Sequence, residues 1–165
     1  MAKISVKKRH TIRRSEIARL KTGLEEQIGE AALIFLTGQI EVVETGTGWK
    51  LYLVKKKNLL MASEAWVFPT LRGLIEHSIP CRQVVVDSGA VRFITNGADV
   101  MRPGIVSVSD DVRAGQPVQV VEERYGKPIA IAVALFDAVD MHNQEKGKSC
   151  KTIHFVGDDL WNLEV

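Results

Sequence analysis

The chain has 165 residues, of which 45% are hydrophobic and 25% charged, the balance of a folded globular protein rather than a disordered one. No apolar run approaches the roughly 20 residues that a membrane-spanning helix needs, and the basic start lacks the apolar core of a secretory signal. The formal charge of +2 hides an asymmetry, because residues 1–21 hold eight lysines and arginines against one glutamate. Residues 81–165 hold nine against twelve acidic residues. We therefore expect a cytoplasmic protein without membrane contact, with a basic N-terminal arm; an amphipathic transit peptide is the alternative for that arm.

The first half is predicted to be a small α/β domain. Apolar residues recur at helical spacing over 17–28, and Gly29 is suited to end this helix. The apolar run 32–44 predicts one or two strands broken near Thr37 and Gly38, and residues 49–54 and 58–62 predict two more. A short helical pattern follows Thr70, with Pro69 predicted in its first turn.

A domain boundary is predicted where Ser78-Ile79-Pro80 ends that helix, which gives domains of 1–79 and 80–165. Residues 84–86 have the pattern of a buried strand, and a short helix is predicted over 89–95. Turn residues then separate further predicted strands at 104–108, 118–123, 129–135, 153–156 and 160–165. Strands at this spacing predict a small barrel or sandwich, so the fold class is α+β.

One segment of the second half carries a specific motif. Gly97-Ala98-Asp99-Val100 and Pro103-Gly104-Ile105 follow a short predicted helix, and this stretch resembles the opening of a PUA domain, an RNA-binding module. The resemblance implies a C-terminal PUA pseudo-barrel of mostly antiparallel strands. It also implies that the first half is a pre-PUA domain.

Two further stretches narrow the resemblance to one family. Residues 68–72 precede the motif, and 153–155 with 157–161 end the chain; together they are similar to the malignant T-cell-amplified sequence family. This resemblance implies a role in translation on the small ribosomal subunit, of the initiation or recycling type, with a partner like density-regulated protein. The short front half is closer to an archaeal member than to a eukaryotic one.

The resemblance implies that RNA, either tRNA or ribosomal RNA, lies along the step from helix to strand. The residues predicted to contact it are Arg92, Asn96, Gly97, Ala98, Met101, Arg102 and Gly104. The structural alternative is that Gly97 ends a helix and Ala98 packs in the barrel. Lysines at 146, 148 and 151 are interpreted as a solvated loop cluster that could also meet phosphate.

The basic arm predicts a second, separable nucleic-acid contact, since clustered cations attract phosphate without reading sequence. Its residues are Lys7, Lys8, Arg9, Arg13 and Arg14. The alternative is a charged strand and helix face that only keeps the protein soluble.

No catalytic or cofactor motif is present. Residues 46–50 lack the spacing of a phosphate-binding loop, and the four histidines do not stand near cysteines at zinc-site spacing. We therefore expect a protein that is not an enzyme and that holds no cofactor or metal. Two other functions stay open: an RNA-targeting subunit for a tRNA or rRNA modification enzyme, and a protein-interaction adaptor.

Overall fold

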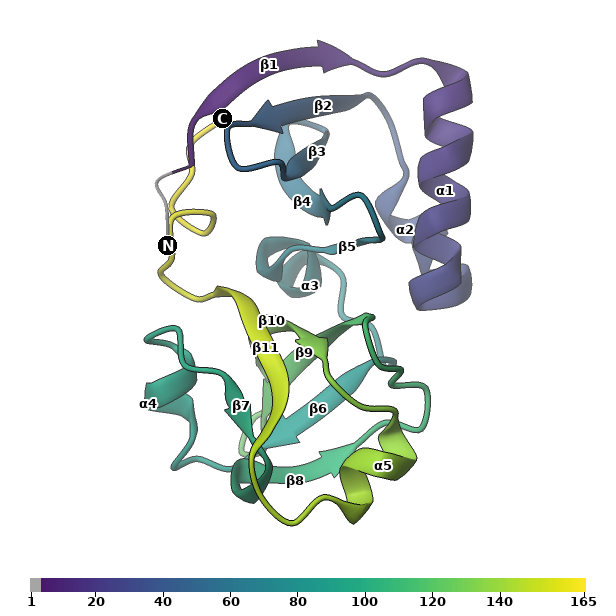
Figure 1. Ribbon diagram of the computed structural model, residues 1–165. Coiled ribbons are helices and arrows are strands. Elements are labelled where there is room, and N and C mark those ends of the chain that lie inside the picture. Colours follow the sequence, from purple (N-terminus) through teal and green to yellow (C-terminus); the bar gives the residue numbers. More distant parts are fainter. Residues whose placement is uncertain (1–3) are drawn as a thin grey trace. The chain divides into compact units, whose positions relative to one another are not determined.

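The N-terminal half folds around one antiparallel sheet with the strand order β1-β2-β3-β4-β5 (Figure 1). In this computed structural model, which describes residues 4–165, the elements are β1 Val6–Thr11, α1 Arg14–Ile28, the 3-10 helix Gly29–Ala31, α2 Ala32–Phe35, β2 Ile40–Thr45, β3 Lys50–Val54, β4 Lys57–Ala62, β5 Val67–Pro69 and α3 Leu71–Glu76. They form one compact unit with Asn162–Val165, called the N-terminal unit below. Lys3 of the basic arm lies outside the described residues.

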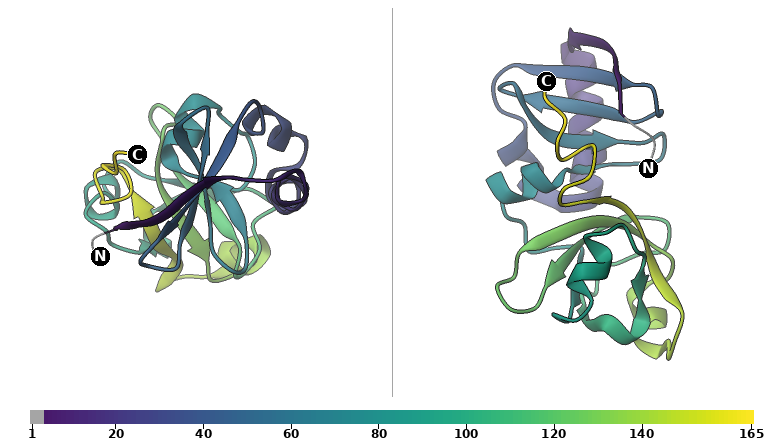
Figure 2. Two further views of the ribbon diagram at one scale, coloured as in Figure 1. Left: turned by 90° about the horizontal axis from the view of Figure 1, so that it is seen from above. Right: turned by 90° about the vertical axis from the view of Figure 1, so that its left-hand side faces the viewer.

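Helix α1 forms where the apolar spacing predicts it. Leu20, Leu24 and Ile28 are buried, and Gly29 ends the helix at φ 62°, with its N–H bonded to the carbonyl of Glu25. The helix runs alongside the stacked strands in the direction from β1 toward β5 (Figures 1 and 2). The buried side of the helix meets the sheet at β5, where Gly23 lies against Val67.

Two predictions for this half are wrong in detail. The run expected to start a strand is helix α2, because Ala32 and Phe35 are buried while the residues between them are exposed. Pro69 ends the edge strand β5, where its missing N–H removes no ladder bond, and it is not in a helix. Helix α3 begins after Thr70 as predicted, and Oγ1 of Thr70 accepts the N–H of Gly73 at 3.1 Å.

The basic arm is folded into a strand and the start of a helix. Residues 6–11 form strand β1, which pairs antiparallel with β2 and is the outer strand of the sheet. All six of its side chains are exposed, so no alternation of buried residues marks this strand in the sequence.

The C-terminal half forms a second sheet with the order β7-β11-β10-β9-β6-β8. Its elements are β6 Gln83–Val86, α4 Val91–Ile94, β7 Val100–Met101, the 3-10 helix Arg102–Gly104, β8 Ile105–Val108, β9 Pro117–Glu122, β10 Pro128–Ala134, α5 Ala138–Asn143 and β11 Lys148–Phe155. Strands β6 and β9 are parallel and all other pairs are antiparallel. Pro80–Trp161 make up this C-terminal unit, whose core holds Val84, Val120 and Met141. The α+β class is confirmed.

Some elements of this half differ from the prediction. Helix α5 was not predicted, and α4 is shorter than the expected 89–95. Strand β11 begins at Lys148, so Lys148 and Lys151 lie on a strand rather than in a loop. The strand expected over 160–165 is absent, because the chain turns after β11. No helix within residues 4–165 is long and apolar enough to cross a membrane.

Asp158 holds this turn together. Its buried carboxylate accepts the N–H groups of Phe155 at 2.9 Å and Trp161 at 2.8 Å, and lies 2.9 Å from Nδ1 of His154. Burial raises the pKa of Asp158, but the bond and charge of His154 and the two backbone bonds outweigh it and lower the pKa. The carboxylate form therefore stabilises the folded C-terminal unit.

We expect Asp158→Asn to reduce the free energy of unfolding by about 1–3 kcal/mol at neutral pH, because buried donors lose their acceptor. The pKa of Asp158 is lower in the folded chain than the value of about 3.9 in an unfolded one. Stability from the carboxylate is therefore complete above about pH 4 and is lost as pH falls through the folded pKa. Urea unfolding followed by the indole NMR signal of Trp161 should show the variant and wild type converging in acid. A constant difference down to low pH would contradict this account.

Candidate nucleic-acid interface

The predicted interface residues lie on one continuous stretch of the C-terminal unit. Arg92 is in α4 and Asn96 follows it, Gly97 and Ala98 form the step to β7, Met101 ends β7, and Arg102 and Gly104 belong to the 3-10 helix. Helix α4 stands at one side of this unit and α5 at another (Figure 1). The sequence motif therefore corresponds to a single surface feature.

The turn before α4 is fixed at both ends. Oδ1 of Asp87 accepts the N–H of Ala90 at 2.9 Å, and the N–H of Asp87 donates to the carbonyl of Gly104 at 2.9 Å. The first bond closes the turn directly before the short helix, and the second ties that turn to the 3-10 helix that follows β7. The bond to Gly104 therefore joins the beginning of this stretch to its end.

Gly97 has a structural role at the step. Its φ is 94°, and its N–H donates to the carbonyl of Ile94 at 2.9 Å. A Cβ at this position would lie 3.2 Å from the ring of Phe155 on β11. Only glycine combines this backbone conformation with so close an approach of the strand.

A recess of about 420 Å³ opens beside this step. It is mostly apolar and is lined by Val86, Asp87, Gly89, Ala90, Phe93, Ile94, Ala98, Asp99, Val100, Met101, Pro103 and Gly104. Of the predicted residues, only Ala98, Met101 and Gly104 line it. Phe93 was missed, although it is 55% exposed; its position off the buried face of the predicted helix is the signal that could have found it.

Arg92 and Asn96 are exposed and do not line the recess. The guanidinium carbon of Arg92 is 4.7 Å from the centre of the Phe93 ring, which is cation–π contact distance. Nδ2 of Asn96 donates to the carbonyl of Arg92 at 2.7 Å, so this amide closes the end of the helix. Arg92 and Phe93 therefore form one exposed pair of a cation and an aromatic ring beside the recess.

Both the backbone and the side chain of Arg102 donate hydrogen bonds within the C-terminal unit. Its backbone N–H donates to the carbonyl of Gly147 at 2.8 Å, and Nη1 donates to the carbonyl of Ile105 at 3.2 Å. Lys148 lies opposite Met101 in the β7–β11 pairing, and its Nζ is 3.1 Å from a carboxylate oxygen of Asp99. These two cations brace the edge of β7.

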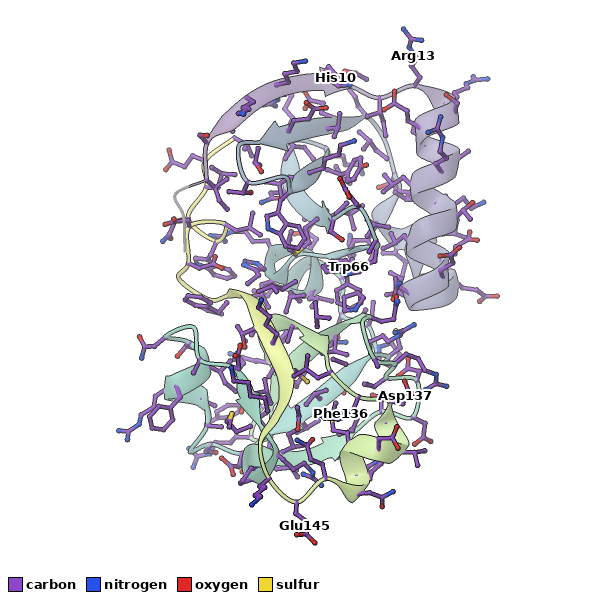
Figure 3. All side chains as sticks on the ribbon, in the orientation of Figure 1. His10, Arg13, Trp66, Phe136, Asp137 and Glu145 are labelled. Carbon is purple, nitrogen blue, oxygen red and sulfur yellow. The ribbon has the colours of Figure 1, made fainter. Side chains whose placement is uncertain are left out.

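The basic residues of the N-terminal unit occupy β1 and the start of α1. Arg9 makes two bonds of 3.1 Å to the carboxylate of Glu41 on β2, and these bonds lower the pKa of Glu41. Lys7 and Lys8 are exposed on β1, and Arg14 is exposed at the first position of α1. Arg13 projects from the start of the helix away from the ribbon (Figure 3). Arg9 is thus the member of this set whose charge is compensated.

Cys150 is buried, and the metal-ligating side chains of the described residues do not cluster. Within residues 4–165, no group of three or more histidine, cysteine or acidic side chains is placed to hold a metal ion. Burial, with the charge of Asp99, raises the pKa of the Cys150 thiol to about 12. That thiol therefore stays protonated at neutral pH.

Comparison with known proteins agrees with this geometry. The family model of the PUA domain matches residues 82–156. The chain is 30% identical to translation machinery-associated protein 20 of Saccharomyces cerevisiae over 150 residues, which cover 86% of this chain and 81% of the yeast protein. The chain belongs to this family of PUA-domain proteins. The malignant T-cell-amplified sequence proteins are further relatives; the 1-B protein of Xenopus laevis is 29% identical over 62% of this chain and 58% of its own.

Archaeal proteins match over nearly the whole length. An uncharacterized protein of Methanocaldococcus jannaschii is 35% identical over 98% of this chain and 99% of its own. The crystal structure of a hypothetical protein from Pyrococcus horikoshii superposes with a TM-score of 0.86 at 33% identity, covering 94% of this chain and 98% of that one. The resemblance to a PUA protein of the translation-associated family is confirmed.

We expect Gly97→Ala to destabilise the C-terminal unit more than Gly115→Ala does. Both glycines have positive φ, so alanine is strained by about 1–2 kcal/mol at either position. At Gly115 a Cβ meets nothing within 4 Å, whereas at Gly97 it also meets Phe155. Denaturant unfolding of both variants measures the difference; equal losses would show that the Phe155 contact is unimportant.

Proposed function

We propose that this protein is a non-catalytic RNA-binding factor of translation in the cytoplasm, which binds tRNA or the ribosomal RNA of the small subunit. The observation that carries the proposal is the apolar recess beside the exposed Arg92–Phe93 pair, on the segment that has the family motif. A partner like density-regulated protein on the small subunit is part of the proposal.

The recess has the chemistry expected for an unstacked nucleobase. Phe93 and Met101 line it and are 55% and 46% exposed, so its walls offer aromatic and soft apolar surface to a ring. Unpaired RNA bases stack on aromatic side chains, and arginine next to the ring can meet the flanking phosphate. Arg92 is placed for that contact because it lies over Phe93 at the rim.

The basic residues of the N-terminal unit supply the second contact. Arg13 and Arg14 stand at the N-terminus of α1, where positive side chains oppose the helix dipole and do not favour folding. With Lys7 and Lys8 they form an exposed cationic edge that attracts phosphate. We therefore assign a sequence-independent role to this edge and base contact to the recess.

Replacing Arg92 by Gln should lower the slope of log affinity against log salt for tRNA by about one unit, because one phosphate contact is lost. Arg113→Gln is the matched control, since this exposed arginine follows β8, at the opposite end of β9 from the turn before α4. It should leave the slope unchanged. Filter binding over a salt series measures both variants. Equal effects of the two changes would argue against a phosphate at Arg92.

Removing the charges at Lys7, Lys8, Arg13 and Arg14 together should weaken binding to small ribosomal subunits and reduce the salt dependence of that binding. The effect should be the same with Arg92 and with Arg92→Gln. Arg9→Gln should have a smaller effect, because Glu41 already compensates its charge. Sedimentation with purified subunits is the measurement.

Two outcomes would overturn the proposed function. Wild-type protein that shifts neither tRNA nor small subunits would indicate a protein adaptor. Co-purification with an RNA-modifying enzyme, and not with ribosomes, would indicate a targeting subunit.

A further inference from the structure

The turn between β9 and β10 is held by several hydrogen bonds to one side chain. The last four of its five residues, Arg124-Tyr125-Gly126-Lys127, are called the hairpin tip below. The carboxylate of Glu122, which is only 8% exposed, accepts the backbone N–H groups of Arg124 and Tyr125 at 2.8 Å and of Lys127 at 3.0 Å. One side chain thus binds three of the four backbone amides of the tip.

These bonds fix the conformation of the tip. The bond from Lys127 lowers the pKa of Glu122 most; burial opposes it, and the bonds from Tyr125 and Arg124 add to it. The fourth amide, that of Gly126, donates to the Glu122 carbonyl at 3.1 Å, and Gly126 has the positive φ of 69° that this turn needs. Every backbone N–H of the tip is therefore engaged while its side chains face solvent.

The rigid tip exposes an aromatic ring between two cations. Tyr125 is 73% exposed, the highest value among the large hydrophobic side chains of the described residues. The guanidinium carbon of Arg124 and Nζ of Lys127 lie 5.8 and 5.9 Å from the ring centre, near the outer limit of cation–π contact. A ring this exposed buries little area within the chain, so the core does not explain the bracing around it.

The hairpin adjoins the recess. The N–H of Glu123 donates to the carbonyl of Val86 at 3.0 Å, and the carboxylate of Glu123 accepts the N–H of Ser88 at 3.3 Å. Val86, Asp87 and Gly89 belong to the lining of the recess. The hairpin is thus bonded directly to the segment that forms one wall of the recess.

We propose that the hairpin tip is a second nucleotide-binding site, which holds one unpaired base of an RNA strand by stacking on Tyr125. Arg124 and Lys127 then contact the phosphates on either side of that base. Single-stranded nucleic acid combines a flat π face with flanking negative charge, which matches an exposed ring between two cations. The proposal rests on the proposed function and extends it, since a strand seated in the recess continues onto the tip.

The test uses the full chain and a single-stranded oligoadenylate of about 12 nucleotides, a length within the usual site size. Tyr125→Ala should weaken binding by about five- to a hundredfold, while Tyr125→Phe keeps the ring and should bind as wild type does. The salt slope should be unchanged in Tyr125→Ala, because no charge is lost. Arg124→Gln and Lys127→Gln should each reduce it by about one unit.

Phe136→Ala is the matched control, because Phe136 follows β10 and therefore lies at the opposite end of that strand from the tip. It should bind oligoadenylate as wild type does. Circular dichroism of each variant confirms folding, which is expected because Tyr125 is exposed.

The failure of this inference differs from the failure of the proposed function. If Tyr125→Ala binds like wild type while Arg92→Gln is weakened, the tip is not a nucleotide site and the proposed function stands. If wild type binds no RNA, the proposed function itself is wrong. Equal weakening by Tyr125→Phe, or equally tight binding of polyglutamate at the tip, would also overturn the inference.

Discussion

Carboxylates bound to backbone amides are the interaction on which the loops of the C-terminal unit depend. Asp87 closes the turn before α4, Asp99 joins the step to β11, Glu122 holds the hairpin tip and Asp158 closes the turn after β11. Each bond gives a backbone N–H a charged acceptor, which makes the bond stronger than one to a neutral acceptor. The loops around the recess therefore keep their shape without a large apolar core of their own.

These bonds affect how the net negative charge of the C-terminal unit should be interpreted. At least seven of the twelve acidic side chains in residues 81–165 accept a backbone N–H. Most of the carboxylates of this unit are therefore bound to its own backbone. Arg92, Arg124 and Lys127 instead have exposed side chains next to aromatic rings. A net count of charges therefore underestimates the positive character of the surface beside the recess.

The sequence predicted most strands of the C-terminal half, because β-branched runs such as Val84-Val85-Val86 are bounded by turn residues. The sequence did not predict two elements that lack a hydrophobic period. Helix α2 is too short to show one, and strand β1 has no buried side. For the site, the motif located the step at Gly97 but not the recess, since Phe93 and Pro103 are brought together by tertiary contacts such as the bond between Asp87 and Gly104. The hairpin tip was predicted as a turn, and its bracing by Glu122 has no local signature.

Several side chains are placed where they do not favour folding, and these side chains belong to the proposed RNA-binding surfaces. Arg13 and Arg14 stand at the wrong end of α1 for its dipole, and Phe93 and Tyr125 expose aromatic rings on well-ordered backbone. Departures of this kind are expected at functional sites, because folding alone gives no reason to keep them. The arginines are cations and the rings offer flat faces, which are the two groups that a single strand of RNA requires. The exceptions to the folding rules therefore point to one class of ligand in both units.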